Sequence, residues 1–296
     1  MSTPQRPTPA DPPPGLIPLL LANLVDDAAV FPPGSAAVPD AVAAHRQHRA
    51  AWYAPLVGPL LLPASALAAA AAALDEDERL TVGVIGDTGF DGLAAAIEAA
   101  DPRLEIRQVE IAVAKRGEDP QPGLRRLVTL LAGRPGLIGY AEIPLTWGLL
   151  GALDALADAR VDVIDIAPKF RTGGLAAELF PTPVELAAVI CACRDRRLPF
   201  KLTAGLHHAL RHTDPETGFH HHGFLNVLVA TLAAADGGEV AEVAELLGGV
   251  EPQPLAEAGC ARSDRARPLW MGFGSCSVVE PLTDLIRLGL VDGGFE

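Results

Sequence analysis

Lysine is scarce in this 296-residue chain: it holds 23 lysines and arginines, of which only Lys115, Lys169 and Lys201 are lysines. Arginine therefore supplies positive charge wherever charge alone is needed. An arginine keeps its proton, whereas a buried lysine can lose it and then act as a nucleophile or a base. We therefore predict functional roles for Lys169 and Lys201, and a surface position for Lys115 beside Arg116 in a polar loop.

Several protein classes are excluded by what the chain lacks. Its formal net charge is −14 and it has no basic stripe, which argues against a nucleic-acid partner. No apolar run reaches the ~18 residues of a membrane span, and the first residues lack the charged-then-apolar order of a signal peptide. The four cysteines do not have the spacing of a metal finger. We expect a cytoplasmic protein with reduced thiols and no membrane contact.

Apolar stretches of strand length alternate with helical patterns along most of the chain. Residues 1–14 are Pro-rich and are predicted to be disordered, whereas residues 15–296 are predicted to form one domain. Eight βα units in a chain of this length predict an α/β fold, a single (β/α)8 barrel of the TIM type, with an open doubly wound sheet as the alternative. Strands are expected at residues 16–24, 57–62, 80–85, 105–112, 137–143, 161–167, 200–204 and 268–273.

In such a barrel the chemistry lies at the C-terminal ends of the strands, where polar residues gather here. Asp26, Glu110, Glu142, Lys169 and Lys201 all stand within or just after predicted strands. Glu142 has apolar neighbours, so its carboxylate needs a partner that Lys169 or Lys201 can supply. We predict catalytic roles for Asp26, Glu142 and Lys169, and for Lys201 as an imine-forming nucleophile or base; a structural ion pair is the alternative. Burial and neighbouring cations would lower the pKa of Lys201, whereas a nearby carboxylate such as Glu142 would raise it.

Two loops are candidates for holding an anion. Arg171 precedes a glycine pair, so a guanidinium group would stand beside exposed backbone N–H groups. The loop after the last predicted strand holds two glycines and precedes a helix start, where anions bind. A tight turn and plain helix capping are the respective alternatives. The predicted substrate-binding residues are Arg171, Gly173, Gly174, Gly274, Ser275 and Ser277, with Thr203 close to Lys201 in its strand.

Six of the eight histidines lie in the stretch from His207 to His222. Neutral imidazoles can bind a divalent metal together with Glu142 or Asp26, or they can act as general acid and base. Because no HxH or HExxH spacing is present on a defined strand, we predict no resident metal or other cofactor, with a catalytic divalent ion as the alternative. His207 and His208 are the favoured catalytic histidines because they lie nearest the strand end. We expect His207 to share one pocket with the charged strand residues.

Five segments resemble an uncharacterised family of bacterial barrel-like proteins. They are DDAAVFPP at residues 26–33, KFRTGG at 169–174, KLTAGLHH at 201–208, HGFLN at 222–226 and FGSCS at 273–277. The resemblance spans residue 26 to the C-terminus and implies site roles for His207, His208, His222 and Asn226, the last two in substrate binding, but it implies no activity. A looser likeness to imine-forming aldolases of the barrel fold rests on a lysine within a late strand.

Together these features predict an enzyme that acts on a small anionic metabolite, either a carboxylate or a phosphate. The favoured chemistry is that of a lyase or isomerase working beside a carbonyl group, with Lys201 as its nucleophile or base. A metal-dependent hydrolase or lyase that uses His207, His208 and a carboxylate is one alternative. A non-catalytic barrel that binds a ligand is the other.

Overall fold

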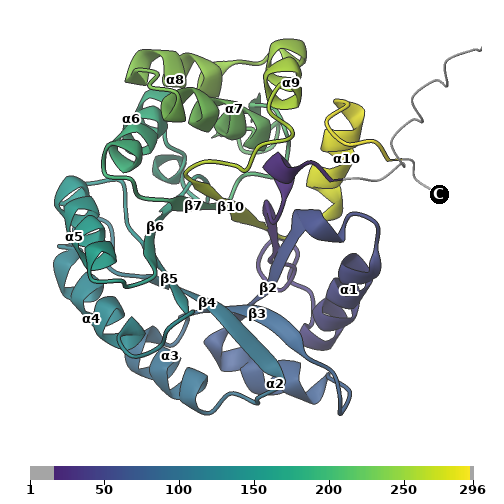
Figure 1. Ribbon diagram of the computed structural model, residues 1–296, viewed down its shortest axis with the longest axis vertical. Helices are drawn as coiled ribbons and strands as arrows, with labels where there is room; N and C mark the ends of the chain where they lie inside the picture. Colours follow the sequence, from purple (N-terminus) through teal and green to yellow (C-terminus); the bar gives the residue numbers. More distant parts are fainter. Residues whose placement is uncertain (1–16, 294–296) are drawn as a thin grey trace, which may run out of the picture.

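Eight parallel strands close into a barrel with helices around it in the computed structural model, which describes residues 17–293 (Figure 1). The order around the barrel is β1-β10-β7-β6-β5-β4-β3-β2, so the predicted (β/α)8 TIM barrel is confirmed. The predicted disorder of residues 1–14 lies outside the described residues. The barrel strands are β1 (Val25–Asp27), β2 (Val57–Pro63), β3 (Leu80–Ile85), β4 (Leu104–Ala112), β5 (Ile138–Glu142), β6 (Ile166–Arg171), β7 (Phe200–Thr203) and β10 (Trp270–Ser275).

Helices cover the outside of the barrel, and the core lies between the two layers. Leu60, Leu62, Val82 and Val84 on neighbouring strands are fully buried, as the apolar runs of a parallel sheet require. The helices are α1 (Val38–Ala50), α2 (Leu67–Ala72), α3 (Gly89–Glu98), α4 (Gln121–Leu131), α5 (Leu149–Val161), α6 (Pro183–Asp195), α7 (Phe224–Ala235), α8 (Val240–Gly248), α9 (Pro252–Cys260) and α10 (Val279–Arg287).

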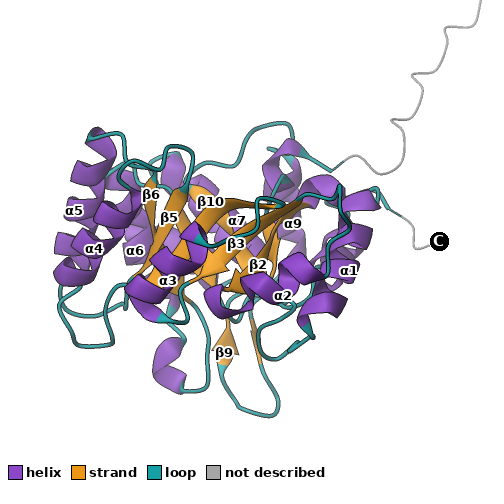
Figure 2. Ribbon diagram, turned by 90° about the horizontal axis from the view of Figure 1, so that it is seen from below, coloured by secondary structure: helices purple, strands orange, loops and turns teal. Residues whose placement is uncertain are grey.

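The loop after β7 carries a small hairpin of β8 (His212–Thr213) and β9 (His220–His221), which Figure 2 shows standing out from the barrel. Its rings pack on the loop after β6, where the centroid of Phe180 lies 5.0 Å from that of Phe219 and 4.8 Å from that of His221. The loops after β6 and β7 therefore support one another at the C-terminal end of the barrel.

Two predicted strand positions are wrong. The sixth strand was expected at residues 161–167, but α5 extends to Val161. Val163, which is 89% exposed and has a φ of 63°, lies in the turn that follows this helix. Lys169 and Arg171 consequently lie within β6 rather than in the loop after it. The first strand was expected at residues 16–24, but Leu19–Leu21 forms a 3-10 turn, and only Val25–Asp27 pairs with the barrel.

Arg267 ties this first segment to β10. Burial lowers the pKa of its guanidinium group to about 10, which leaves it charged near neutral pH. The group donates hydrogen bonds of 2.6–3.3 Å to five backbone carbonyls, those of Leu20, Ala22, Asn23, Trp270 and Met271. One side chain thus supplies donors to backbone groups of two segments that lie far apart in the sequence.

Among the described residues, no helix combines the length and the apolar character needed to cross a membrane.

We predict that Arg267→Lys lowers the free energy of unfolding by about 3–6 kcal/mol. An ammonium group has three donors in place of five, so at least two carbonyls lose a charge-assisted hydrogen bond worth ~1.5–3 kcal/mol. Urea unfolding followed by circular dichroism measures the change. Arg265→Lys, at an exposed position two residues away, is the control; equal stabilities of the two variants would contradict the role assigned to Arg267.

Candidate active site

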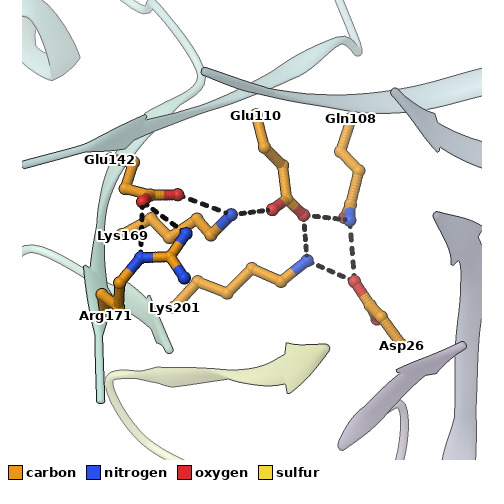
Figure 3. Close-up of polar contacts among 7 residues, drawn as sticks. All are labelled: Asp26, Gln108, Glu110, Glu142, Lys169, Arg171 and Lys201. Atoms are coloured by element: carbon orange, nitrogen blue, oxygen red, sulfur yellow. Dashed lines mark hydrogen bonds and ion pairs between the residues drawn. The ribbon is translucent and has the colours of Figure 1, made fainter. Parts of the chain in front are cut away.

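Polar side chains from five strands meet inside the barrel (Figure 3). Successive strand residues point to opposite faces, so residues two apart share a face. This alternation brings two polar residues inward from β4 and from β6 in particular. The group drawn in Figure 3 consists of Asp26 of β1, Gln108 and Glu110 of β4, Glu142 of β5, Lys169 and Arg171 of β6, and Lys201 of β7. We call these seven residues the charged network.

Glu110 lies at the centre of the charged network and is 1% exposed. Its Oε1 atom accepts a hydrogen bond of 2.5 Å from the Nζ atom of Lys201, and its Oε2 atom lies 2.6 Å from the Nζ atom of Lys169. Burial alone would raise the pKa of Glu110, but the two ammonium groups outweigh it and lower that pKa to about 2. Glu110 is therefore a carboxylate shared by two lysines.

Lys201 is held between two carboxylates. Its Nζ atom contacts Asp26 as well as Glu110 and lies 4.8 Å from the ring centre of Tyr140. Burial alone would lower the pKa of Lys201, but the charges of Asp26 and Glu110 raise it above its ordinary value. Of the two opposing effects expected on this pKa, the carboxylates prevail in the free protein, because Asp26 and Glu110 are in direct contact with the Lys201 ammonium group.

Asp26 is the carboxylate of the charged network that takes up a proton most readily. Burial raises its pKa, while Lys201 and the 2.7 Å hydrogen bond from Gln108 Nε2 only partly oppose this shift. The Gln108 amide also donates to Glu110, at 3.0 Å, and so holds the two acids in place. A Cβ atom at Gly58 would lie 2.0 Å from Asp26 Oδ1, so a glycine is needed beside this carboxylate.

The outer end of the charged network reaches the mouth of the barrel. Glu142 Oε2 lies 3.0 Å from Lys169 Nζ, and Glu142 Oε1 accepts bonds of 3.2 and 3.0 Å from Nε and Nη2 of Arg171. Burial would raise the pKa of Glu142, but the two cations lower it. The side chains are 2% exposed at Lys201, 5% at Lys169, 20% at Glu142 and 42% at Arg171. A ligand entering from solvent therefore meets Arg171 and Glu142 first.

A cavity of about 350 Å³ opens over the ends of β4, β5 and β6. Arg171 and Glu142 form part of its wall, and Lys115 and Arg116 of the loop after β4 form another part. The remaining wall is mainly aliphatic, with Ile143, Leu145 and Leu179 among its residues, and it also includes the acidic residues Glu178 and Glu185. The cavity thus joins a side with charges of both signs to an apolar side, and both lie next to the charged network.

His207 and His208 lie outside the charged network. The Nδ1 atom of His207 is 3.5 Å from Glu280 Oε2 and 3.7 Å from the Cys276 sulfur, while His208 Nδ1 is 3.4 Å from Asp284 Oδ2. The prediction that His207 meets the charged strand residues is therefore wrong, because the loop after β7 carries it toward α10. Within residues 17–293, no group of three or more His, Cys, Asp or Glu side chains is arranged to hold a metal ion.

His222 and Asn226 are fully buried and bonded to the backbone. The Nε2 atom of His222 lies 2.8 Å from the Pro181 carbonyl oxygen, and burial lowers the pKa of this imidazole to about 4, so that it is neutral and donates there. The Asn226 amide donates to the carbonyls of Leu246 and Gly249, both at 2.8 Å. The two residues fasten neighbouring loops and helices to one another.

The glycine pair after β6 permits close packing of loops. A Cβ atom at Gly173 would lie 2.8 Å from the Cα atom of Gly205, and one at Gly174 would lie 2.4 Å from Leu179 Cδ1. Gly173 therefore lets the ends of β6 and β7 approach backbone to backbone. Thr203 joins the same corner, since its carbonyl accepts a 2.9 Å hydrogen bond from the backbone of the loop after β6.

The end of β10 and the loop that follows it are bonded to one another and to the start of α10; Gly274 and Ser275, which were predicted in the loop, lie within β10. The Ser275 hydroxyl donates to the Ser277 carbonyl at 2.7 Å, and the Ser277 hydroxyl accepts a 3.2 Å bond from the Glu280 amide. Gly274 pairs with Asp26 of β1 and with Thr203 of β7. None of the described residues of this loop lines the cavity that Arg171 enters.

Sequence analysis assigned no role to the centre of the charged network. Glu110 appeared only as one polar residue among the strand ends, and Gln108 and Tyr140 were not proposed. The signal was present, because Gln108 and Glu110 stand two apart in a strand that is otherwise apolar toward its end. Two polar residues on one face of a strand covered on both sides have to find partners inside the barrel.

No family model matches the chain, and no curated protein matches it. The closed barrel is a fold that many enzymes share, and it is compatible with an enzyme here. Because one fold serves many activities, the function has to be inferred from the site.

We predict that Lys201→Met lowers the free energy of unfolding by about 3–5 kcal/mol at pH 7. Removal of the ammonium group leaves Asp26 and Glu110 buried together without their shared partner. Without Lys201, burial raises the pKa of Asp26 further in the folded state, while Lys169 still pairs with Glu110. The folded variant then binds a proton more readily than the unfolded chain, so the deficit should shrink as the pH falls from 7 to 5.

The exposed Lys115→Met variant is the control, with an expected change within about 0.5 kcal/mol. Chemical unfolding at both pH values measures the two differences. A Lys201→Met protein as stable as the wild type would show that the charged network does not stabilise the fold.

Proposed function

We propose that this barrel is an enzyme, a lyase or isomerase that works beside the carbonyl group of a small anionic metabolite through an imine on a lysine of the charged network. The observation that carries the proposal is the sharing of Glu110 by Lys169 and Lys201 next to the cavity. Two amines flanked by three carboxylates provide nucleophile, acid and base within one set of contacts.

Each lysine has a carboxylate that can take its proton. Lys201 contacts Asp26, whose pKa is raised, and Lys169 contacts Glu142 at the mouth. Transfer of a proton leaves a neutral amine, which attacks the substrate carbonyl carbon. The carbonyl oxygen then takes this proton back from the carboxyl group and a second proton from the amine, and leaves as water. The resulting iminium ion accepts electrons from the neighbouring bond, which allows cleavage of a carbon–carbon bond or removal of a proton.

The partly exposed guanidinium group of Arg171 supports an anionic substrate. Arg171 donates to Glu142 with Nε and Nη2, and its guanidinium group, 42% exposed, can also meet a ligand from solvent. Arg116 is exposed on the same wall. We also propose that the enzyme is cytoplasmic and has neither a nucleic-acid partner nor a membrane partner.

A non-catalytic barrel that binds a ligand is the alternative, since a balanced set of buried charges can be purely structural. The metal-dependent route has less support, because His207 and His208 face different carboxylates. Chemical trapping separates imine chemistry from both.

We predict that borohydride, added with a panel of small carbonyl compounds, traps a stable adduct on Lys169 or Lys201. Peptide mass mapping locates it among the three lysines of the chain, and the same treatment of the urea-unfolded protein gives the background labelling of each lysine. Lys169→Arg and Lys201→Arg keep the charge but cannot form an imine. The variant at the labelled position should lose the adduct.

Equal labelling of all three lysines by every compound of the panel would contradict the imine mechanism. Loss of fold in the arginine variants is checked by circular dichroism, and the wild-type mapping alone still tests the proposal.

A further inference from the structure

A single carboxylate fills the gap between Arg171 and Lys169. Glu142 places Oε1 at 3.0 Å from Arg171 Nη2 and Oε2 at 3.0 Å from Lys169 Nζ. The two oxygen atoms of one carboxylate are bonded to the same carbon atom. A ligand that bridges the same two cations must therefore contact them with two oxygen atoms that are about as close to each other as those of a carboxylate.

The Glu142 side chain also separates Lys169 from solvent. Glu142 and Arg171 line the cavity, whereas Lys169 does not line it and its side chain is 5% exposed. Glu142 stands at the end of β5, followed by a loop rather than by further strand. Movement of this one side chain would open Lys169 to the cavity.

We infer that the substrate is a 2-oxo acid whose carboxylate takes the place of Glu142 on Arg171 and whose ketone meets Lys169. This inference rests on the proposed imine function and names its substrate and its amine. In a 2-oxo acid the carboxylate and the ketone are on adjacent carbon atoms, so one oxygen of each fits the short gap that Glu142 bridges. A carbonyl several bonds away from a phosphate does not fit it.

The bound substrate also explains how Lys169 loses its proton. In the free protein, burial would lower the pKa of Lys169, but Glu110 and Glu142 raise it. When the substrate carboxylate replaces Glu142 on Arg171, Glu142 loses one of the two cations that lower its pKa, so it can accept the proton of Lys169. This favours Lys169 as the reacting amine, because Lys201 keeps both of its carboxylate partners.

The covalent step balances without any further reactant. The Lys169 ammonium group gives one proton to the displaced Glu142 carboxylate, and the neutral amine forms a bond to C2 of the 2-oxo acid. The ketone oxygen takes the proton from Glu142 and a second proton from the amine, and leaves as water. The product is an iminium ion on Lys169, with Glu142 again a carboxylate.

The cavity wall indicates what the rest of the substrate looks like. Ile143, Leu145 and Leu179 give the wall an aliphatic part, and the cations of Lys115 and Arg116 are matched there by the carboxylates of Glu178 and Glu185. An apolar chain on the 2-oxo acid would bury surface against the aliphatic part. We therefore expect 2-oxo acids with short aliphatic chains to bind better than those with a second charge.

The test uses 2-oxobutyrate and butanone, which differ by the carboxylate, with borohydride as the hydride donor. We expect 2-oxobutyrate to label Lys169 at least ten times more than butanone does. Arg171→Gln should reduce labelling by 2-oxobutyrate about tenfold or more and leave labelling by butanone nearly unchanged. Arg107→Gln, an exposed arginine paired with Glu105 outside the cavity, is the matched control.

Glu142→Gln gives an independent measurement of the same site by calorimetry. It keeps the size of the side chain but removes the charge that competes for Arg171, so 2-oxobutyrate should bind at least five times more tightly than to the wild type. Weaker or unchanged binding would overturn the placement of the carboxylate on Arg171.

The outcomes separate this inference from the proposed function. Labelling of Lys201, or equal labelling by the two probes, would overturn the inference and leave imine chemistry in place. Labelling of Lys169 by other carbonyl compounds but not by 2-oxobutyrate would also overturn it. Labelling above background of neither Lys169 nor Lys201 by any compound would overturn both.

Discussion

The ion pairs of Glu110 with Lys169 and Lys201 are the contacts on which the interior of the barrel depends. They join β4 to β6 and β7, which are not its neighbours in the sheet. Removing charges from water is costly, and a well-packed apolar interior is often as stable as a buried ion pair. A barrel that keeps six charged groups here, three of each sign, therefore retains an arrangement that stability alone does not require. Perturbed pKa values in such a cluster are typical of functional sites.

The alternation of strands and helices could be predicted because it depends on local patterns. The predicted third strand at residues 80–85 coincides with β3, because its apolar run has clear ends in the sequence. The sixth strand could not be positioned from local sequence, because Val161 and Val163 suit a strand but are exposed in the structure. Packing of α5 and pairing of β6 with β5 and β7 decide where the strand begins, and both are tertiary effects.

The site was predictable to the extent that it follows from strand geometry. Glu142, Lys169, Arg171 and Lys201 meet because they lie on inward faces of consecutive, adjacent strands. The positions of the histidines could not be predicted in this way, because they lie in a loop and a hairpin whose path does not follow from a sequence periodicity. The partners of His207 and His208 on α10, Glu280 and Asp284, are far away in the sequence. A count of histidines could therefore suggest a cluster but could not place it.

The order of charges from the closed interior to the mouth links stability to reactivity. Deep in the barrel, Lys201 has two carboxylate partners and is held as an ammonium ion. Near the mouth, Glu142 is shared between Lys169 and the half-exposed Arg171, so a competing anion can release it without disturbing the inner pairs. Glu110 then still neutralises both lysines in part. The same chain of contacts can thus keep its inner end fixed while its outer end exchanges a protein carboxylate for that of a substrate.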